Sequence, residues 1–208
     1  MKVLLINGSS KNNGCTFTAL NEVAKTLEEQ GIDTEFMNLG SASVRDCIGC
    51  KKCVDLDKKC IFDDDIVNDL INAAAEADGF IFGTPVYYAH PSGRILSVLD
   101  RAFYAGSSVF RHKPGAAIAS ARRSGTTASI DVLNKYFTFA EMPIVSSTYW
   151  NTIHGNSPDE TIQDLEGMQI MRNLGLNMAW LLKCIEIGKE NGIEIPLTDR
   201  SQRTNFIR

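Results

Sequence analysis

The first sixteen residues, Met1-Lys-Val-Leu-Leu-Ile-Asn-Gly-Ser-Ser-Lys-Asn-Asn-Gly-Cys-Thr16, decide the fold of this chain. Residues 3–6 form a short, continuous apolar run, which is typical of a strand buried on both faces of a parallel sheet. The polar residues 7–13 follow, and a helical pattern begins at Gly14. A strand that enters a small polar turn and then a helix leaves free backbone N–H groups at the helix start. This arrangement favours an anion, most often a phosphate.

The spacing of this loop narrows the kind of phosphate ligand. A P-loop needs Gly, four residues and then Gly-Lys-Ser/Thr, but five residues separate Gly8 from Gly14 and no lysine follows. The Gly-x-Gly-x-x-Gly of dinucleotide sites is absent, and no acidic residue ends the second predicted strand. A phosphate monoester held by backbone amides and the hydroxyls of Ser9, Ser10 and Thr16 fits better. The alternative is an ordinary strand–helix turn without a ligand.

The composition predicts one soluble domain without nucleic-acid or membrane partners. The chain has 208 residues, 44% of them hydrophobic and 22% charged, with a formal net charge of −4. No apolar run approaches membrane-spanning length, and the apolar start is too short for a secretory signal. We therefore expect a cytoplasmic protein, whose six cysteines are thiols or metal ligands rather than disulfides.

Predicted strands and helices alternate along the rest of the chain. Strands are expected at 32–39, 79–83, 116–120 and 143–147, and helices at 15–30, 63–77, from 91 through 103, from 126 to 139 and from 158 to 189. Asp63 is predicted to cap the second helix, Pro91 to lie in the first turn of the third, and residues 157–160 to form a capping box. Residues 148–156 are expected to be irregular. This alternation predicts a doubly wound α/β sheet in which the loops after strands one, three and four converge.

Several stretches together resemble a known family. The stretch Asn7-Gly-Ser-Ser-Lys-Asn-Asn-Gly-Cys-Thr16 resembles the phosphate loop of flavodoxin-like NAD(P)H-dependent FMN reductases. Gly83-Thr-Pro-Val-Tyr-Tyr88, followed by Leu99-Asp-Arg101, resembles their flavin-ring loop and next helix. The cysteine run at 47–60 resembles the iron–sulfur flavoprotein branch. The resemblance covers nearly the whole chain and implies a flavodoxin-like, five-stranded parallel sheet of order 2-1-3-4-5 in a single domain, with a cysteine-rich loop at 41–62 and a polar tail from Pro196.

The resemblance also implies where FMN would lie. It implies phosphate contacts from Ser9, Lys11, Asn13, Cys15 and Thr16, a ring wall of Pro85, Val86, Tyr87 and Tyr88, and a third side closed by Ala121, Arg122, Arg123, Ser124 and Gly125. Cys15 departs from the family pattern, which commonly has asparagine there, and a thiol is a poorer phosphate donor than an amide. From the residues alone, ordinary packing of the two tyrosines and solvated arginines at a helix start remain open.

The run Cys47-x2-Cys50-x2-Cys53-x6-Cys60 is the second candidate site. Closely spaced thiolates can hold a [4Fe–4S] cluster, and the bacterial ferredoxin run opens with the same two spacings. Zinc sites usually pair two separated knuckles, whereas three of these cysteines are crowded together. A metal-free loop, zinc and a regulatory disulfide remain open. The loop leaves the second predicted strand at the edge of the flavin loops, so a cluster there would serve a flavin of its own subunit or of a partner. Cys184, among apolar residues, is expected in the core.

The sequence thus predicts an FMN-dependent oxidoreductase. It would take hydride from NAD(P)H and pass electrons to a quinone, flavin or redox protein, through the cluster if one is bound. No side chain is assigned as catalytic, because the flavin carries the chemistry. Among the histidines, His154 is best placed near the flavin, since Tyr149, Trp150 and Asn151 precede it. The alternative function is a non-enzymatic electron carrier or a thiol redox sensor, and the resemblance implies a homodimer or a higher homo-oligomer.

Overall fold

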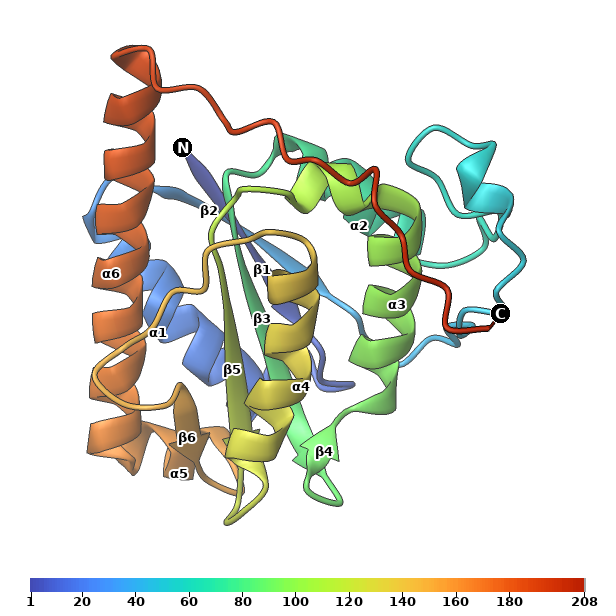
Figure 1. The fold of residues 1–208 in the computed structure, drawn as a ribbon. Helices are drawn as coiled ribbons and strands as arrows, with labels where there is room; N and C mark the ends of the chain where they lie inside the picture. The colour runs from blue at the N-terminus through green and yellow to red at the C-terminus, as the bar shows by residue number, and fades with distance from the viewer. Residues whose placement is uncertain (208) are drawn as a thin grey trace.

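The computed structural model describes residues 1–207 and has a parallel β-sheet at its centre (Figure 1). The strand order is β2 (Asp33–Asn38), β1 (Lys2–Asn7), β3 (Gly79–Tyr87), β5 (Gly115–Ala121) and β6 (Thr152–His154), and all neighbours are parallel. A short strand, β4 (His90–Pro91), pairs with β3 in the antiparallel sense and brings the sheet to six strands. The five parallel strands therefore have the predicted order 2-1-3-4-5.

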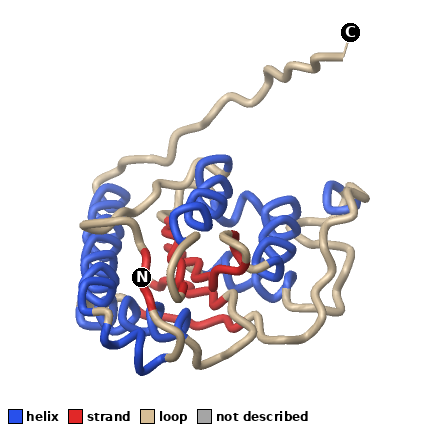
Figure 2. Tube along the Cα trace, turned by 90° about the horizontal axis from the view of Figure 1, so that it is seen from below, coloured by secondary structure: helices blue, strands red, loops and turns tan. Residues whose placement is uncertain are grey.

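Helices cover both faces of this sheet, as Figure 2 shows from the end of the molecule. Helices α1 (Cys15–Glu29) and α6 (Leu165–Glu190) pack on one face, and α2 (Val67–Glu76), α3 (Gly93–Phe110) and α4 (Thr126–Phe139) pack on the other. The short helices η1 (Lys52–Val54) and α5 (Pro158–Gln163) lie in connections. No helix within residues 1–207 is long and apolar enough to cross a membrane.

The apolar run in β1 is buried on both faces, as its sequence predicts. Val3 and Leu5 belong to the core beneath α1 and α6, and Leu4 and Ile6 belong to the core beneath α2, α3 and α4. All four side chains are fully buried, and each such side chain contributes about 1.5–3 kcal/mol of hydrophobic free energy. The strand holds the two helical layers on one sheet and so places Asn7 and Gly8 at its carboxyl edge.

The last predicted strand, at 143–147, is wrong. Only an isolated bridge joins Ile144 to Gly115, and the strand that pairs with the end of β5 is β6, inside the stretch expected to be irregular. The reason is competition from α6, whose polar groups bond the intervening segment. Ser147 Oγ donates to the Ile170 carbonyl (2.7 Å), and Asn177 Nδ2 donates to the Ser146 carbonyl (2.8 Å). These bonds hold residues 146–147 against α6 instead of the sheet, and the chain pairs with β5 again only from Thr152.

Two predicted helix starts are also wrong. Helix α2 begins at Val67, because the Asp63 carboxylate accepts a hydrogen bond from the Asn68 side chain (2.8 Å) instead of capping the helix. Pro91 lies in β4, and Ser92 caps α3 by accepting from the Ile95 amide (3.3 Å). A side-chain hydrogen bond within the loop before α2 thus occupies Asp63, and pairing with β3 places Pro91 in a strand.

The long final helix is two helices. The predicted cap at Ser157 is confirmed, since its hydroxyl accepts from the Glu160 amide (3.2 Å) at the start of α5. The helix then breaks at Asp164, which caps α6 through the Gly167 amide (2.9 Å). Cys184 is exposed on α6 rather than in the core, because the end of this helix runs past the residues that pack on the sheet.

Candidate functional site

The loops after β1, β3 and β5 meet at the carboxyl edge of the sheet, the lower edge in Figure 1. The Gly8 amide donates to the Gly83 carbonyl (2.8 Å), and the Ser92 hydroxyl donates to the Gly8 carbonyl (2.9 Å). The hydroxyls of Thr16 and Ser120 share a hydrogen bond of 2.8 Å. These contacts bring the predicted phosphate loop together with the two predicted flavin-ring loops.

The shape of the phosphate loop is held by one buried side chain, Asn7. Its Oδ1 accepts from the Ser9 amide (3.1 Å), and its Nδ2 donates to the carbonyls of Lys11 (3.3 Å) and Asn12 (3.4 Å). Gly14 occupies the N-cap position of α1 and has no side chain to cap it. The first backbone N–H groups of α1 therefore point into the loop without a capping partner, which is the arrangement an anion needs.

The five predicted phosphate residues all lie around this helix start. Ser9 is buried, and its hydroxyl accepts from the Lys11 amide (3.1 Å), which leaves its own proton free to donate. Lys11 and Asn13 are exposed, and Thr16 is buried against Ser120. The Cys15 thiol turns to the Gly155 carbonyl (3.7 Å). Cys15 therefore offers a backbone amide to the loop rather than its side chain.

The predicted ring wall is a β-hairpin. Pro85, Val86 and Tyr87 continue β3 past its predicted end, and Val86 and Tyr87 pair with β4. Tyr88 and Ala89 form the turn with φ values of +52° and +58°, the backbone that two-residue hairpin turns favour. Tyr87 is half exposed, whereas Tyr88 lies at the tip with its side chain in solvent. The hairpin thus holds three of the predicted wall residues, Pro85, Val86 and Tyr87, together at the end of β3.

The third predicted side, residues 121–125, closes directly onto this hairpin. Gly125 has φ +93°, and a Cβ atom built on it would lie 2.5 Å from Ala89 Cα and 2.8 Å from Val86 Cγ1. Only glycine permits so close an approach in this conformation. Arg122, Arg123 and Ser124 are exposed at the mouth, where the arginines carry positive charge.

Residues outside the predicted set complete the site. Asn7 is the last residue of β1 and Ser120 the last but one of β5, so a polar residue near the end of a buried strand was the available signal. Ser92 had no local signal, because its bond to Gly8 joins residues far apart in sequence. The loop after β6 joins as well, since the Ala121 carbonyl accepts from the Gly155 amide (3.1 Å) and lies 3.2 Å from His154 Nδ1. His154 thus lies at this edge of the sheet.

The four cysteines of the predicted metal site line one cavity of about 50 Å³, together with Arg101, Tyr104 and Ala105 of α3. Burial raises the pKa of the Cys53 thiol, and charge repulsion from the neighbouring cysteines raises it further. Within residues 1–207, no three His, Cys, Asp or Glu side chains are arranged to hold a single metal ion. A [4Fe–4S] cluster instead takes one thiolate on each of four irons, and four sulfurs on one cavity are the donor set that it requires.

This cavity lies beside α3, while the cysteine loop leaves β2 at the carboxyl edge, as the sequence predicts. The cysteine loop starts at the carboxyl edge but crosses to the outer side of α3 (Figure 1). Arg101 and Tyr104 lie about two to three helical turns from the start of α3, which is roughly 12–17 Å along its axis. The cysteines are therefore set apart from the flavin loops. A larger hollow, about 560 Å³, lies between α3 and α4 and includes none of the predicted flavin residues.

The parallel sheet of order 2-1-3-4-5, an open helix start after its first strand and two further loops at the same edge define a flavodoxin-like protein. The family model described as NADPH-dependent FMN reductase matches residues 1–157, and the chain belongs to that family. The chain is 32% identical over 195 residues to an iron–sulfur flavoprotein of Methanocaldococcus jannaschii, covering 89% of this chain and 100% of the relative. A second iron–sulfur flavoprotein of that organism is 28% identical, with coverage of 83% and 92%.

Solved structures support the same fold. A flavodoxin from the domain Archaea superposes with a TM-score of 0.61 at 15% identity, covering 88% of this chain and 99% of that one. The apo form of an NADH:FMN oxidoreductase superposes with a TM-score of 0.64 at 14% identity, with coverage of 86% and 89%. At these identities the likeness shows the fold alone. Fold and family together make this protein an FMN-dependent oxidoreductase.

Proposed function

We propose that this protein takes hydride from NAD(P)H onto FMN and passes the electrons to a small-molecule acceptor or a redox protein. The observation that carries the proposal is the meeting of three loops at one sheet edge, around the uncapped start of α1. FMN, when bound, supplies both hydride and single-electron chemistry. The protein's part is to bind and orient it.

Each loop has a separate task in this proposal. The free amides of α1 and the hydroxyls of Ser9 and Thr16 bind the phosphate, and the hairpin of β3 and β4 gives the ring a wall. The loop of residues 121–125 contacts the flavin ring on the side away from the hairpin. Arg122 and Arg123, exposed at the mouth, attract the phosphates of the dinucleotide. None of these residues needs to act as an acid or a base.

We further propose that Cys47, Cys50, Cys53 and Cys60 hold a [4Fe–4S] cluster. Two observations support it: all four line one cavity, and the relatives that match nearly the whole chain are named iron–sulfur flavoproteins. The cluster would pass single electrons between the flavin and the acceptor. Because the cavity lies beside α3 and away from the flavin loops, we favour a route to the flavin of a partner subunit.

Anaerobically purified protein tests both proposals. We expect an absorption spectrum with flavin and iron–sulfur bands, iron on analysis, and steady oxidation of NADH or NADPH with a quinone or free FMN as acceptor. Bound FMN without NAD(P)H turnover would indicate an electron carrier instead. Protein that contains FMN and no iron would reject the cluster and leave the reductase intact.

Substitutions test the phosphate loop. Ser9→Ala and Thr16→Ala each remove a hydroxyl that this proposal assigns to the phosphate, beside the uncapped start of α1. A hydrogen bond to a charged group contributes about 1.5–3 kcal/mol, so FMN affinity should fall roughly 10- to 100-fold. The matched control is Thr138→Ala, at the far end of α4. FMN titration by flavin fluorescence measures the affinity, and unchanged binding in both loop variants would reject the assignment.

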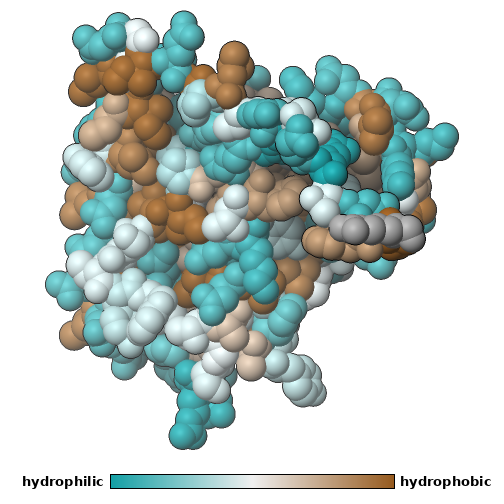
Figure 3. Space-filling model, in the orientation of Figure 1, coloured by the Kyte–Doolittle hydropathy of each residue, from teal (hydrophilic) through white to brown (hydrophobic). Residues whose placement is uncertain are grey.

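The oligomer remains a prediction. Helix α6 exposes large apolar side chains, and hydrophobic surface gathers over its end at the upper left of Figure 3. Trp180 is 68% exposed and Ile187 is 59% exposed. Light scattering of the holoprotein should give a homodimer or a higher homo-oligomer, and a monomer at micromolar concentration would contradict it.

A further inference from the structure

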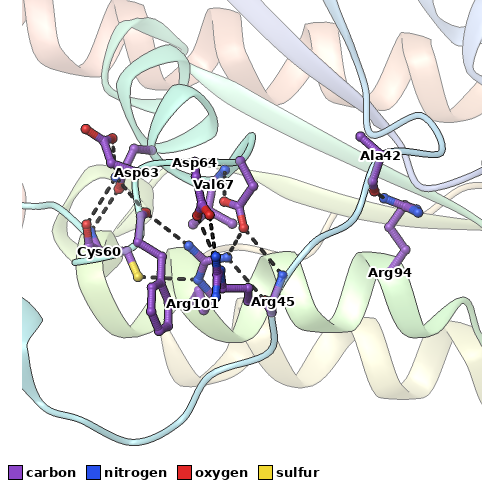
Figure 4. Close-up of polar contacts among 11 residues, drawn as sticks. Ala42, Arg45, Cys60, Asp63, Asp64, Val67, Arg94 and Arg101 are labelled. Carbon is purple, nitrogen blue, oxygen red and sulfur yellow. Dashed lines mark hydrogen bonds and ion pairs between the residues drawn. The ribbon is translucent and has the colours of Figure 1, made fainter.

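A buried guanidinium, that of Arg101, lies where the cysteine loop meets α3 (Figure 4). The residue is only 2% exposed, although a buried cation is costly unless its donors are all engaged. Nη1 forms an ion pair with Asp65 and donates to the Arg45 carbonyl (3.1 Å). Nη2 donates to the Phe62 carbonyl (3.1 Å). These contacts fix the plane of the guanidinium.

The Nε donor of Arg101 is aimed at a cysteine. Its Nε lies 3.3 Å from Cys60 Sγ and donates to it. The charge of Arg101 is already balanced by its ion pair with Asp65, and both side chains are buried, at 1% and 4% exposed. The bond to sulfur is therefore not needed to neutralise the guanidinium. The contacts of Nη1 and Nη2 set the orientation of the guanidinium, and this orientation directs Nε toward the Cys60 sulfur.

Cys60 is held from a second helix as well. Its amide donates to Asn68 Oδ1 (2.8 Å), and its carbonyl accepts from Asn68 Nδ2 (3.1 Å). Asn68 is buried in the first turn of α2. Backbone and sulfur of Cys60 are thus tied to two packed helices. The other three cysteines lie in residues 47–53, a stretch whose regular structure is limited to the start of η1.

We infer that Arg101 is a positioning residue for the proposed iron–sulfur site. It presents Cys60 as a pre-formed ligand, onto which the more loosely held Cys47, Cys50 and Cys53 close, and it keeps an N–H on that ligand sulfur in the loaded protein. A hydrogen bond to a ligand sulfur favours the reduced, more negative cluster and so raises its reduction potential. The inference rests on the proposed cluster and adds which residue of the chain sets its properties.

The variant that tests it is Arg101→Lys in the iron-loaded holoprotein. Lysine keeps a positive charge beside Asp65 but lacks the planar fork that reaches both the carboxylate and the sulfur. Loss of a partner of this kind typically costs 10- to 100-fold in metal affinity, so iron release to a chelator should be about ten times faster. The midpoint potential of the cluster, measured by redox titration, should fall.

Two further variants separate a role toward sulfur from a purely structural one. Arg94→Lys alters another arginine of α3, which bonds the loop at the Ala42 carbonyl and is not among the partners of a cysteine. This variant should leave both the rate of iron release and the midpoint potential unchanged. Asn68→Ala removes the hold on the Cys60 backbone but keeps the bond to its sulfur, so it should speed iron release without lowering the potential.

The outcomes distinguish the inference from the function on which it rests. A wild-type protein without iron would overturn the cluster and the role of Arg101 together. Iron-loaded protein whose potential is the same in the wild type and in Arg101→Lys would overturn the role of Arg101 alone. A potential that falls equally in Asn68→Ala and Arg101→Lys would assign the effect to the loop's position and also overturn the hydrogen bond to sulfur.

Discussion

The absence of a side chain at Gly125 lets two loops of the flavin site touch. The loop after β5 approaches the β3–β4 hairpin so closely that a Cβ atom would lie 2.5 Å from Ala89 Cα. The same residue has a left-handed φ of +93°, a conformation that also favours glycine. A turn at this glycine was readable from the sequence. The contact was not, because Ala89 and Val86 belong to another loop.

Gly125→Ala should therefore destabilise the protein by about 2–4 kcal/mol, from backbone strain and overpacking together. The matched control is Gly31→Ala, at φ +77° with nothing within 4 Å of the added Cβ. It should cost only the strain, about 1–2 kcal/mol. Urea unfolding of the two variants measures the difference. Equal losses would show that the hairpin moves aside at no cost.

At the scale of single residues, the polar turn and the helix start after β1 were predictable, and the hydrogen bonds that hold the turn were not. The polar turn and open helix start around Ser9 and Thr16 follow from local spacing. The role of Asn7 depends on its neighbour Asn38 in β2 and on carbonyls of the loop, which the strand pairing brings together. Cys15 stood out as a departure from the family pattern, and its bond to Gly155 shows where the thiol goes.

At the scale of elements, Asp164 joins the short edge strand to the longest helix. Its Oδ1 caps α6 through the Gly167 amide, and its Oδ2 accepts from the His154 amide of β6 (2.7 Å). The helix break at Asp164 went unpredicted because the apolar periodicity continues through it. Two amides from different elements, one of them in a strand, compete successfully with helix continuation.

Asp164→Ala should cost about 2–3 kcal/mol, because it removes a cap and leaves the His154 amide without its carboxylate partner. Ser157→Ala is the comparison, since it removes the cap of α5 alone and should cost about 1 kcal/mol. Thermal or urea unfolding monitored by circular dichroism measures both. If Asp164→Ala cost no more than Ser157→Ala, the link to β6 would contribute nothing.

At the scale of the whole molecule, the C-terminal tail is tied to the body near Glu141. The tail leaves α6 as an extended segment (Figure 2), and Arg200 forms an ion pair with the Glu141 carboxylate. Hydrogen bonds from Arg200 and Thr198 lower the pKa of Glu141. A carboxyl whose pKa is lowered in the folded state stabilises it above the ordinary glutamate pKa, and that contribution disappears as pH falls through the lowered value.

Arg200→Ala should thus lower the melting temperature slightly at pH 7, by a few degrees at most, because exposed ion pairs contribute little. The difference from wild type should persist down to about pH 5 and shrink as the pH falls below the ordinary glutamate pKa of about 4.3 and through the lowered pKa of Glu141. Arg203→Ala is the control, since Arg203 forms no ion pair within residues 1–207. A difference that stays constant down to pH 3 would contradict this account.

The sequence by itself determined the alternation of strands and helices in a layered α/β fold and the cysteine run, and its resemblance to a family implied the strand order. The alternation and the cysteine run depend on apolar periodicity and residue spacing, which act over a few neighbours. Only the tertiary structure decided that β6 replaces the strand expected at 143–147, that Gly125 meets Ala89, and that Cys60 rests on Arg101 and Asn68. Each of these depends on polar groups or close contacts between residues distant in sequence, and no local pattern records which partner will be nearest once the sheet has formed.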